Sequence, residues 1–318
     1  DVKRAAKRIA MLCLAVLLAA SLLTSCRSSG VKVKTDDKGF YDYNGYIIKS
    51  EYPMDEQSLD KAGEKLRKIY ELYLKDQDVK TYFAIVPDKN AWAFEAEGQN
   101  VINYSELYAR MQADTENFAS YIELDDLLNM ESYYKTDAHW RQEKIYPVAQ
   151  RIAEAMGCEL TAEYDKAVAN DSFIGAYGRQ SDLAMEPEEL IYLTNEALDA
   201  CIVTDYASAD ERNVTTGVYT IAKAASADGE GYDMFLGGAK SLLTIENPAS
   251  TTDKELIIFR DSFGSSIAPF FTECYRKVTL VDTRYLPSER VGKFVDFDRQ
   301  DILFLYSVPV LNNSVMLK

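Results

Sequence analysis

Histidine is almost absent from this sequence: His139 is the only one among 318 residues. Imidazole is the side chain that most often acts as a general base near neutral pH, so one residue carries that possibility for the whole chain. The shortage also argues against zinc, because zinc sites combine several histidines or clustered cysteines. We therefore expect no metal and no other cofactor, and we examine His139 first.

Cysteine is scarce and scattered. Of the five cysteines, Cys13 and Cys26 fall near the N-terminus. The other three, Cys158, Cys201 and Cys274, are an odd number at wide spacings, which predicts neither a disulfide framework nor a metal site. We expect these three to be small buried side chains.

Basic residues are outnumbered: 35 Lys and Arg face 51 Asp and Glu, for a net charge of −16. The first 26 residues are basic, so the rest of the chain is more acidic still. An acidic surface repels phosphate backbones. We therefore expect no nucleic-acid partner.

Residues 1–26 have the pattern of a targeting signal. Basic residues precede an apolar run over residues 9–23, which is shorter than the roughly 20 apolar residues of a membrane span. Leu23-Thr24-Ser25-Cys26 then closes the run. This resembles a bacterial lipoprotein signal, which implies that a lipid on Cys26 anchors the protein outside the cytoplasmic membrane. A plain signal peptide or signal anchor with an incidental cysteine is the alternative.

The remainder is predicted to comprise a tether and N-terminal extension over residues 27–50 and one domain over residues 51–318. Apolar side chains recur on one face of residues 58–75, which predicts a helix with Ser58 as its N-cap. Further helices are predicted over 103–111, 142–156, 263–275 and 288–294, and strands over 79–86, 119–124, 255–259, 278–281 and 302–306. This alternation indicates a mostly parallel sheet. Residues 160–250 mix strand patterns with glycine-containing loops, which predicts a mixed insertion.

Two short motifs provide a candidate nucleophile and its base. An apolar strand leads into Arg260-Asp261-Ser262-Phe263-Gly264, a pattern that exposes a serine hydroxyl at a strand-to-helix turn. Asp137 stands two residues before His139. Serine needs a base to take its proton, and a carboxylate fixes the tautomer of that base. Ser262, His139 and Asp137 are therefore predicted to form a catalytic triad, although Asp137 could instead cap a helix and His139 could be a packed surface residue.

Four motifs in the same order resemble the DHHW family of exported Gram-positive proteins, named for a Thr-Asp-His-His-Trp motif. They are Thr136-Asp137-Ala138-His139-Trp140, Tyr232-Asp233-Met234-Phe235-Leu236-Gly237-Gly238, Arg260-Asp261-Ser262-Phe263 and Val281-Asp282-Thr283-Arg284-Tyr285. That family is similar to the SGNH-hydrolase-like acetyltransferases of alginate O-acetylation. The resemblance implies a three-layer α/β SGNH-hydrolase-like fold and assigns the triad to Asp137, His139 and Ser262. Ala138 departs from the motif, since a histidine is expected there.

The resemblance also implies a function, namely serine-dependent O-acetyl transfer to a cell-surface polysaccharide through an acyl-enzyme. A membrane-bound O-acyltransferase would be the partner that brings the acetyl group across the membrane. A carbohydrate acetyl esterase would use the same triad. A non-catalytic module that binds polysaccharide or assembles a complex also stays open, since Ala138 and Ala239 both depart from the family pattern.

Five further residues are predicted to contact the substrate or oxyanion. Gly238 and Gly237 could supply backbone donors for an oxyanion. Trp140 could form a sugar-stacking wall, with a packing anchor as the alternative. Arg284 could face the site from beyond its strand, or form a surface salt bridge. Lys89 could lie at the edge of the site, or in a solvated turn.

Overall fold

The structure is a computed structural model that describes residues 31–94, 96–206, 211–225 and 230–318. The predicted lipoprotein signal, including Cys26, and the first residues of the predicted tether lie outside the described residues. Within the described ranges, no helix is long and apolar enough to cross a membrane.

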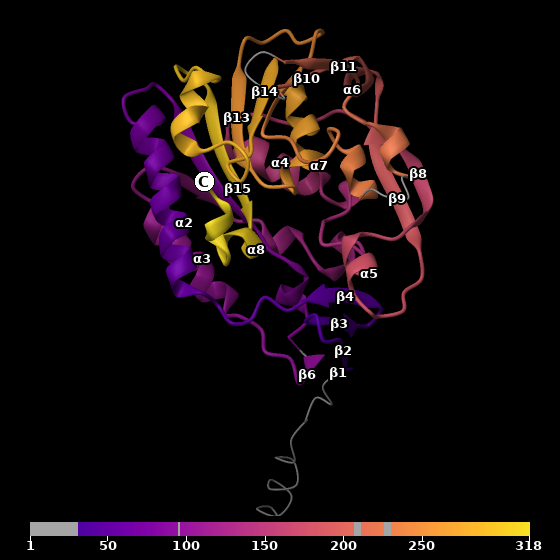
Figure 1. Cartoon of the computed structure of the whole chain (residues 1–318). Helices are drawn as coiled ribbons and strands as arrows, with labels where there is room; N and C mark the ends of the chain where they lie inside the picture. Colours follow the sequence, from indigo (N-terminus) through magenta and orange to yellow (C-terminus); the bar gives the residue numbers. More distant parts are fainter. Residues whose placement is uncertain (1–30, 95, 207–210, 226–229) are drawn as a thin grey trace, which may run out of the picture.

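The described part of the predicted tether and extension is built of short strands. They are β1 (Val31–Lys32), β2 (Lys34–Thr35), β3 (Phe40–Tyr43) and β4 (Tyr46–Lys49). β2, β3 and β4 form an antiparallel sheet, while β1 pairs with β6 (Ala96–Glu97). The Tyr41 hydroxyl donates to Asn90 Oδ1 (2.7 Å), and the Ile47 N–H donates to the Lys135 carbonyl (2.8 Å). These contacts attach the small sheet to the lower end of the domain in Figure 1.

An eight-stranded sheet forms the centre of the molecule. In sheet order its strands are β11 (Asn213–Thr216), β10 (Ile202–Asp205), β12 (Leu242–Glu246), β14 (Lys277–Val281), β13 (Glu255–Arg260), β15 (Asp301–Ser307), β5 (Lys80–Val86) and β7 (Ser120–Ile122). From β14 to β7 all neighbours are parallel, whereas β12, β10 and β11 add antiparallel strands at one edge. The predicted mostly parallel sheet is confirmed, because its parallel strands are those separated by helices along the chain.

Helices cover both faces of this sheet (Figure 1). Along β5, Phe83 and Ile85 face one hydrophobic core, and Tyr82 and Ala84 face the other, as the twofold alternation of a strand requires. The first core is closed by α2 (Glu56–Ile69) and α3 (Tyr104–Thr115). The second is closed by α4 (Tyr146–Ala155), α7 (Gly264–Ile267) and the 3₁₀ turn η8 (Ala268–Glu273). The result is a three-layer α/β arrangement.

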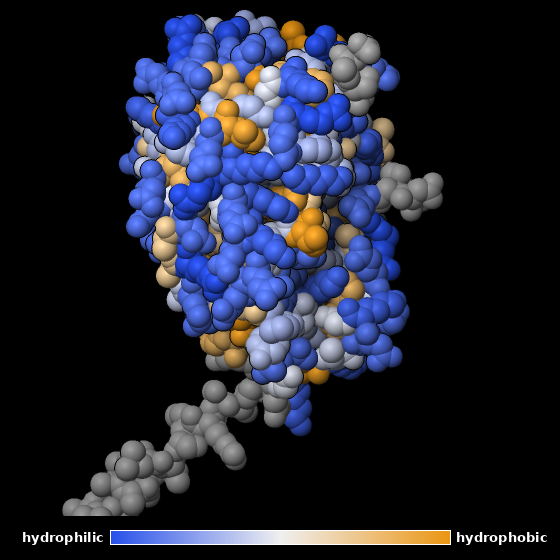
Figure 2. Space-filling model, turned by 60° about the vertical axis from the view of Figure 1, so that its left-hand side comes forward, coloured by the Kyte–Doolittle hydropathy of each residue, from blue (hydrophilic) through white to orange (hydrophobic). Residues whose placement is uncertain are grey.

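Helix α2 illustrates how pattern and capping set an element. Leu59 and Leu66 are buried on its inner face, while the outer face contributes to the hydrophilic surface in Figure 2. The N-cap is Asp55, whose carboxylate accepts the Ser58 N–H (3.0 Å), so the prediction of Ser58 as the cap is wrong. The Ser58 hydroxyl instead donates to the Leu311 carbonyl (3.0 Å), a tertiary contact that the local pattern does not reveal.

The two halves of the predicted insertion at 160–250 belong to different sheets. Its first half forms a separate antiparallel pair with short helices beside it, namely β8 (Asp165–Phe173), α5 (Ala176–Gln180), β9 (Glu188–Thr194) and α6 (Glu196–Ala200). Its second half supplies β10, β11 and β12, which extend the central sheet. The last helix, α8 (Val308–Leu311), follows β15.

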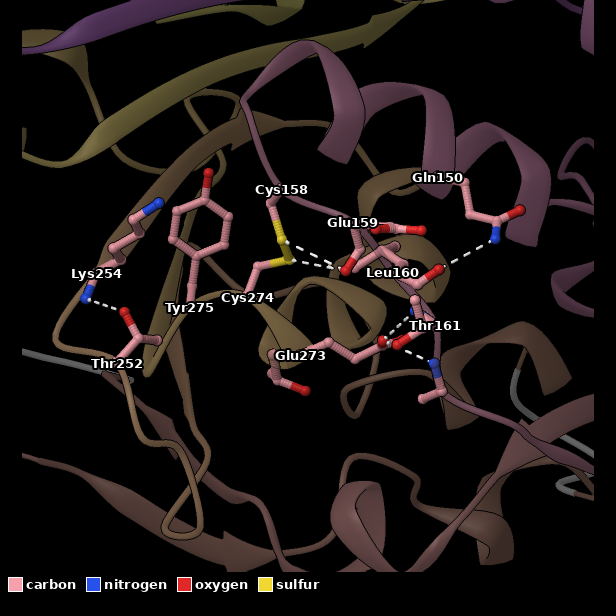
Figure 3. The surroundings of a disulfide bond; sticks show 12 residues. Gln150, Cys158, Glu159, Leu160, Thr161, Thr252, Lys254, Glu273, Cys274 and Tyr275 are labelled. Carbon is pink, nitrogen blue, oxygen red and sulfur yellow. Dashed lines mark hydrogen bonds between the residues drawn. A yellow bond between two sulfur atoms is a disulfide. The ribbon is translucent and has the colours of Figure 1, made fainter.

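Two of the scattered cysteines form a disulfide, which corrects the expectation that they would be unpaired. Cys158 follows α4 and Cys274 follows η8, 116 residues later. Figure 3 shows the Glu273 carboxylate beside this bond, where it accepts the N–H groups of Thr161 and Ala162 (both 2.9 Å). The segment after α4 is thus fixed to η8 twice. Cys201 is free and buried, as expected.

Candidate active site

The predicted nucleophile lies at the carboxyl edge of the parallel strands. β13 ends at Arg260, and Ser262 follows in the turn before α7. The Asp261 carboxylate holds this turn, because it accepts the N–H of Phe263 (3.0 Å) and the N–H of Ser307 (2.7 Å) from the end of β15. Ser262 itself stays partly exposed. Open α/β sheets bind ligands at this edge.

The structure brings the three predicted triad residues together. His139 Nε2 lies 2.7 Å from Ser262 Oγ, across 123 residues of sequence. His139 Nδ1 lies 2.6 Å from Asp137 Oδ1. Both distances are those of hydrogen bonds. Asp137 and His139 are buried, so the hydrogen-bonded chain runs from the interior outward to the partly exposed hydroxyl.

The environment of Asp137 fixes the direction of these hydrogen bonds. Its Oδ1 also accepts the His139 N–H (3.0 Å), and its Oδ2 accepts the Ala176 N–H (2.7 Å). Burial raises the pKa of Asp137, but the electrostatic attraction of the adjoining imidazole and these hydrogen bonds outweigh burial and hold the pKa below its ordinary value. An ionised Asp137 can only accept, so His139 Nδ1 carries the proton and Nε2 is free to accept the Ser262 hydroxyl.

The start of α5 supports Asp137, a role that the sequence alone did not indicate. A Cβ at Gly175 would lie 2.3 Å from the Asp137 Cβ, so only glycine permits this approach. The Gly175 N–H donates to the Thr136 hydroxyl (2.9 Å), which in turn donates to Glu188 Oε1 (2.9 Å). The carboxylate of the triad is therefore positioned by two insertion elements, α5 and β9.

An aromatic ring covers the imidazole. The rings of Tyr232 and His139 are stacked, with centroids 3.8 Å apart and planes 6° apart. Burial raises the pKa of Tyr232, so its hydroxyl stays protonated and donates to Ser266 Oγ (2.7 Å). Ser266 Oγ also accepts the Trp140 Nε1–H (2.9 Å). Tyr232 and Ser266 were missed as site residues, although Tyr232 opens one of the four motifs.

One predicted substrate contact, Trp140, is wrong, and a second, Arg284, is paired with another side chain. Trp140 is fully buried and packs edge-on against Phe263, so it is a packing anchor and not a sugar-stacking wall. Arg284 forms a bidentate ion pair with the buried Asp282 (2.9 and 2.7 Å). Its guanidinium is therefore engaged by a buried carboxylate and does not form the surface salt bridge that was the alternative, while its place in the substrate site stays a prediction.

Lys89 is neither at a substrate edge nor in a solvated turn. Its side chain is 2% exposed. Its ammonium donates to the carbonyls of Ile47, Tyr134 (3.0 Å) and Asp137 (2.8 Å). Burial lowers the pKa of Lys89 to about 7, against the opposing charges that include Asp137. Lys89 thus joins β4 to the loop that carries the triad acid and base.

Gly237 and Gly238 form a left-handed turn, with φ of 74° and 89°. A Cβ at Gly238 would collide with the Asp233 carboxylate, and the Gly237 carbonyl accepts Lys223 Nζ (2.6 Å). Neither makes a hydrogen bond to Ser262 in the described parts of the chain, so their role as oxyanion donors stays a prediction. The N–H of Ser262 has no protein acceptor within the same described ranges.

Groups able to hold a metal are not seen at the site. In the described part of the chain, no cluster of three or more His, Cys, Asp or Glu side chains is placed to bind one. The arrangement itself is suited to activating a serine hydroxyl for attack on an acyl carbon.

Comparisons with known proteins place the chain in a family and identify its fold. A family model described as DHHW protein matches residues 74–281. A DHHW family protein from Eubacterium siraeum DSM 15702 superposes with a TM-score of 0.68 at 18% identity, over 89% of this chain and 94% of that one. Bacillus cereus PatB1, solved with a sulfonyl adduct, gives 0.65 at 19% identity over 88% and 95%.

A third solved structure is the O-acetyltransferase domain of Pseudomonas putida AlgJ, with a TM-score of 0.50 at 12% identity over 88% of this chain and 92% of that one. No curated protein sequence matches the chain. At these identities the solved structures establish the fold, and they confirm the predicted three-layer α/β class.

Proposed function

Because this chain belongs to the DHHW family and has an SGNH-hydrolase-like fold, we propose that it is a serine-dependent O-acetyltransferase that modifies a cell-surface polysaccharide. The observation that carries the proposal is the hydrogen-bonded chain from Asp137 through His139 to Ser262. The likeness to the AlgJ O-acetyltransferase domain supports the choice of acetyl transfer. The formed triad gives no support to a purely binding module.

In the first half of the reaction, Ser262 Oγ attacks the carbonyl carbon of an acetyl ester while its proton passes to His139 Nε2. Asp137 holds the Nδ1–H and stabilises the imidazolium that forms. The tetrahedral intermediate places negative charge on the former carbonyl oxygen, and the Ser262 N–H is available to stabilise it. The C–O bond to the donor then breaks, the donor oxygen takes the proton from Nε2, and acetyl-Ser262 remains.

In the second half, a sugar hydroxyl attacks the acetyl carbon and passes its proton to His139 Nε2. The intermediate collapses, the bond to Ser262 Oγ breaks, and Oγ recovers that proton. The product is an acetylated sugar and free enzyme. With water in place of the sugar the same residues would give an esterase, so the acceptor decides between the two activities.

The test begins with the nucleophile. The wild-type protein should react with an aryl sulfonyl fluoride and hydrolyse 4-nitrophenyl acetate, whereas Ser262→Ala and His139→Ala should do neither at a comparable rate. Ser265→Ala is the matched control, since Ser265 lies at the start of α7, directly after this turn, and its side chain makes no hydrogen bond to the imidazole in the described part of the chain. Labelling that persists in Ser262→Ala would assign the nucleophile elsewhere, and an unreactive wild type would favour the binding module.

A second measurement separates transferase from esterase. Acetyl-enzyme formed from 4-nitrophenyl acetate is offered a pentamer of N-acetylglucosamine, an acidic uronate oligomer or buffer alone. Mass spectrometry of the sugar and assay of free acetate then give the partition. Acetylated oligosaccharide that appears only with intact Ser262 supports the transferase, whereas acetate alone with every acceptor supports the esterase.

We further propose that the protein works outside the cytoplasm as a lipoprotein anchored through Cys26. A disulfide such as Cys158–Cys274 is typical of oxidising compartments and supports export. A diacylglyceryl group on Cys26 would supply two chains, enough for stable anchoring, and would hold the site near a membrane-bound O-acyltransferase that supplies acetyl groups. Cys26→Ala should release the protein from membranes or block its processing, and unchanged fractionation would contradict the anchor.

A further inference from the structure

Arg260, two residues before the nucleophile, is a fully buried cation with incomplete hydrogen bonding. Its Nη1 donates to the Asp261 carbonyl (3.2 Å) and lies 3.7 Å from Asp282 Oδ2. Its Nε and Nη2 have no partner among the residues that the structure describes. A buried donor without an acceptor is costly, and a buried charge more so. The position therefore requires an explanation other than stability.

The neighbouring carboxylates do not provide one. Asp282 is already held by both Nε and Nη2 of Arg284, in good bidentate geometry. Asp261 is satisfied by two backbone N–H groups, from Phe263 and Ser307. No carboxylate in this cluster therefore depends on Arg260 as a hydrogen-bond donor, although its charge helps to balance the two carboxylates.

The group that Arg260 does hold is the peptide bond between Asp261 and Ser262. The peptide is planar, so fixing the direction of the Asp261 carbonyl also fixes the opposite direction of the Ser262 N–H. The same carbonyl accepts the Gly264 N–H (3.1 Å) as the next turn begins. A charged donor on the carbonyl polarises the peptide and makes its N–H a stronger donor.

The close packing of this turn shows that the contact is built in. A Cβ at Gly264 would lie 2.8 Å from the Arg260 Cβ, so glycine lets the helix start directly over the arginine side chain. The guanidinium is therefore held beneath the nucleophile turn, away from water. In such a dry environment a fixed positive charge acts strongly on charge that develops nearby.

We propose that Arg260 is a positioning residue for the oxyanion hole, which orients and polarises the Ser262 N–H through the Asp261 carbonyl. The inference rests on the proposed acyl transfer. On this view, the buried guanidinium is unfavourable for folding and is retained because it serves catalysis. Features that are unfavourable for folding are expected mainly at functional sites.

The test is Arg260→Met, which keeps a long side chain and removes the charge. Loss of an oxyanion donor costs about 10²- to 10³-fold, so loss of its orientation and polarisation should lower kcat/KM for 4-nitrophenyl acetate by about 10- to 100-fold. Phenylboronic acid forms a tetrahedral adduct with an activated serine, so its inhibition constant should rise by a similar factor. The midpoint of urea unfolding should stay about the same, because the two unsatisfied buried donors are removed together with the charge.

Two control variants are expected to behave differently from Arg260→Met. Arg284→Met removes the bidentate partner of a fully buried carboxylate and should lower the urea midpoint. Arg276→Met removes only an exposed ion pair with Glu255, at the other end of β13, and should change neither kinetics nor stability.

The outcomes are separable. Wild-type kinetics and boronate affinity in Arg260→Met would overturn the inference while leaving the triad intact. A lower urea midpoint or failure to fold would also overturn it, since Arg260 would then be a structural cation. A wild type that neither turns over the ester nor reacts with sulfonyl fluoride would refute the proposed function itself.

Discussion

Asp137→Asn changes a single atom in a site where every donor to the carboxylate is known. Oδ1 accepts two N–H groups, from the ring and the backbone of His139, and Oδ2 accepts the Ala176 N–H. An asparagine has only one oxygen, so its amide nitrogen must face donors in either orientation. In either orientation, therefore, the amide N–H group of asparagine points at a protein N–H group. Asparagine has nearly the same shape as aspartate, so a change in packing does not remove this mismatch of donors.

The two orientations have different consequences. If the amide nitrogen faces Ala176, a partly buried backbone donor is left without its protein acceptor, at a cost of up to about 1 to 3 kcal/mol. If it faces His139, the backbone N–H of that residue loses its acceptor instead, and Nδ1 must become an acceptor of the new N–H. The proton then resides on Nε2, which can no longer accept the Ser262 hydroxyl. In a well-studied triad, the same change lowers kcat by about 10⁴-fold.

We expect Asp137→Asn to lower kcat for 4-nitrophenyl acetate by about 10³- to 10⁴-fold, and at least as much as Asp137→Ala. The sequence offers an unusual assay, because His139 is the only histidine in the chain. Uniform ¹⁵N-histidine labelling of a protein without a histidine tag therefore yields the NMR signals of this one imidazole. The wild type should show the Nδ1–H tautomer and the variant a large Nε2–H population. Retention of more than about a tenth of the activity, or an unchanged tautomer, would refute this reasoning.

Three further outcomes are expected. Removing the disulfide with Cys158→Ala and Cys274→Ala should lower the free energy of unfolding in urea by about 4 to 5 kcal/mol, from the loss of a crosslink over 116 residues, and a change below about 1 kcal/mol would contradict this. Gly175→Ala should depress turnover without removing any triad atom, because the new Cβ would lie 2.3 Å from the Asp137 Cβ; normal kinetics would show that α5 can move away at no cost. Because the folded pKa of Asp137 is lowered, its contribution to stability is present above the ordinary aspartate pKa of about 3.9 and is lost as the pH falls toward the folded value. The wild type should therefore lose stability on acidification more steeply than Asp137→Asn, and parallel curves would disprove the link.

Much of the fold could be predicted because its signals are local. The strands of the parallel half were predicted to within a few residues, since each is a short apolar run next to an amphipathic helix. The antiparallel edge was not predicted, because β10 and β12 lie within a stretch that lacks this alternation. Their place depends on partners far along the chain, as in the pairing of Leu242 with Val281.

In the site, too, residues within local motifs could be predicted, and residues that depend on distant contacts could not. Ser262, Asp137 and His139 could be selected because each belongs to a short motif with its own chemistry. Ala176 and Ser266 could not, because their contacts to the motif are made by a backbone N–H and a hydroxyl that carry no distinctive pattern. The disulfide was missed for a related reason: an odd number of cysteines hides which two are close in space.

The errors at Trp140 and Lys89 share one physical cause. Both stand in or beside motifs near a loop of irregular backbone, and a polar or aromatic side chain in such a place was taken to face substrate. An irregular loop in the interior must still satisfy its own carbonyls and N–H groups. Lys89 helps by donating to the Tyr134 and Asp137 carbonyls, and Trp140 ties the loop to α7 by donating to the Ser266 hydroxyl. Side chains beside a reactive loop are therefore used first to hold the loop in place, and those that remain partly exposed, such as Ser262, are the better candidates for contact with a substrate.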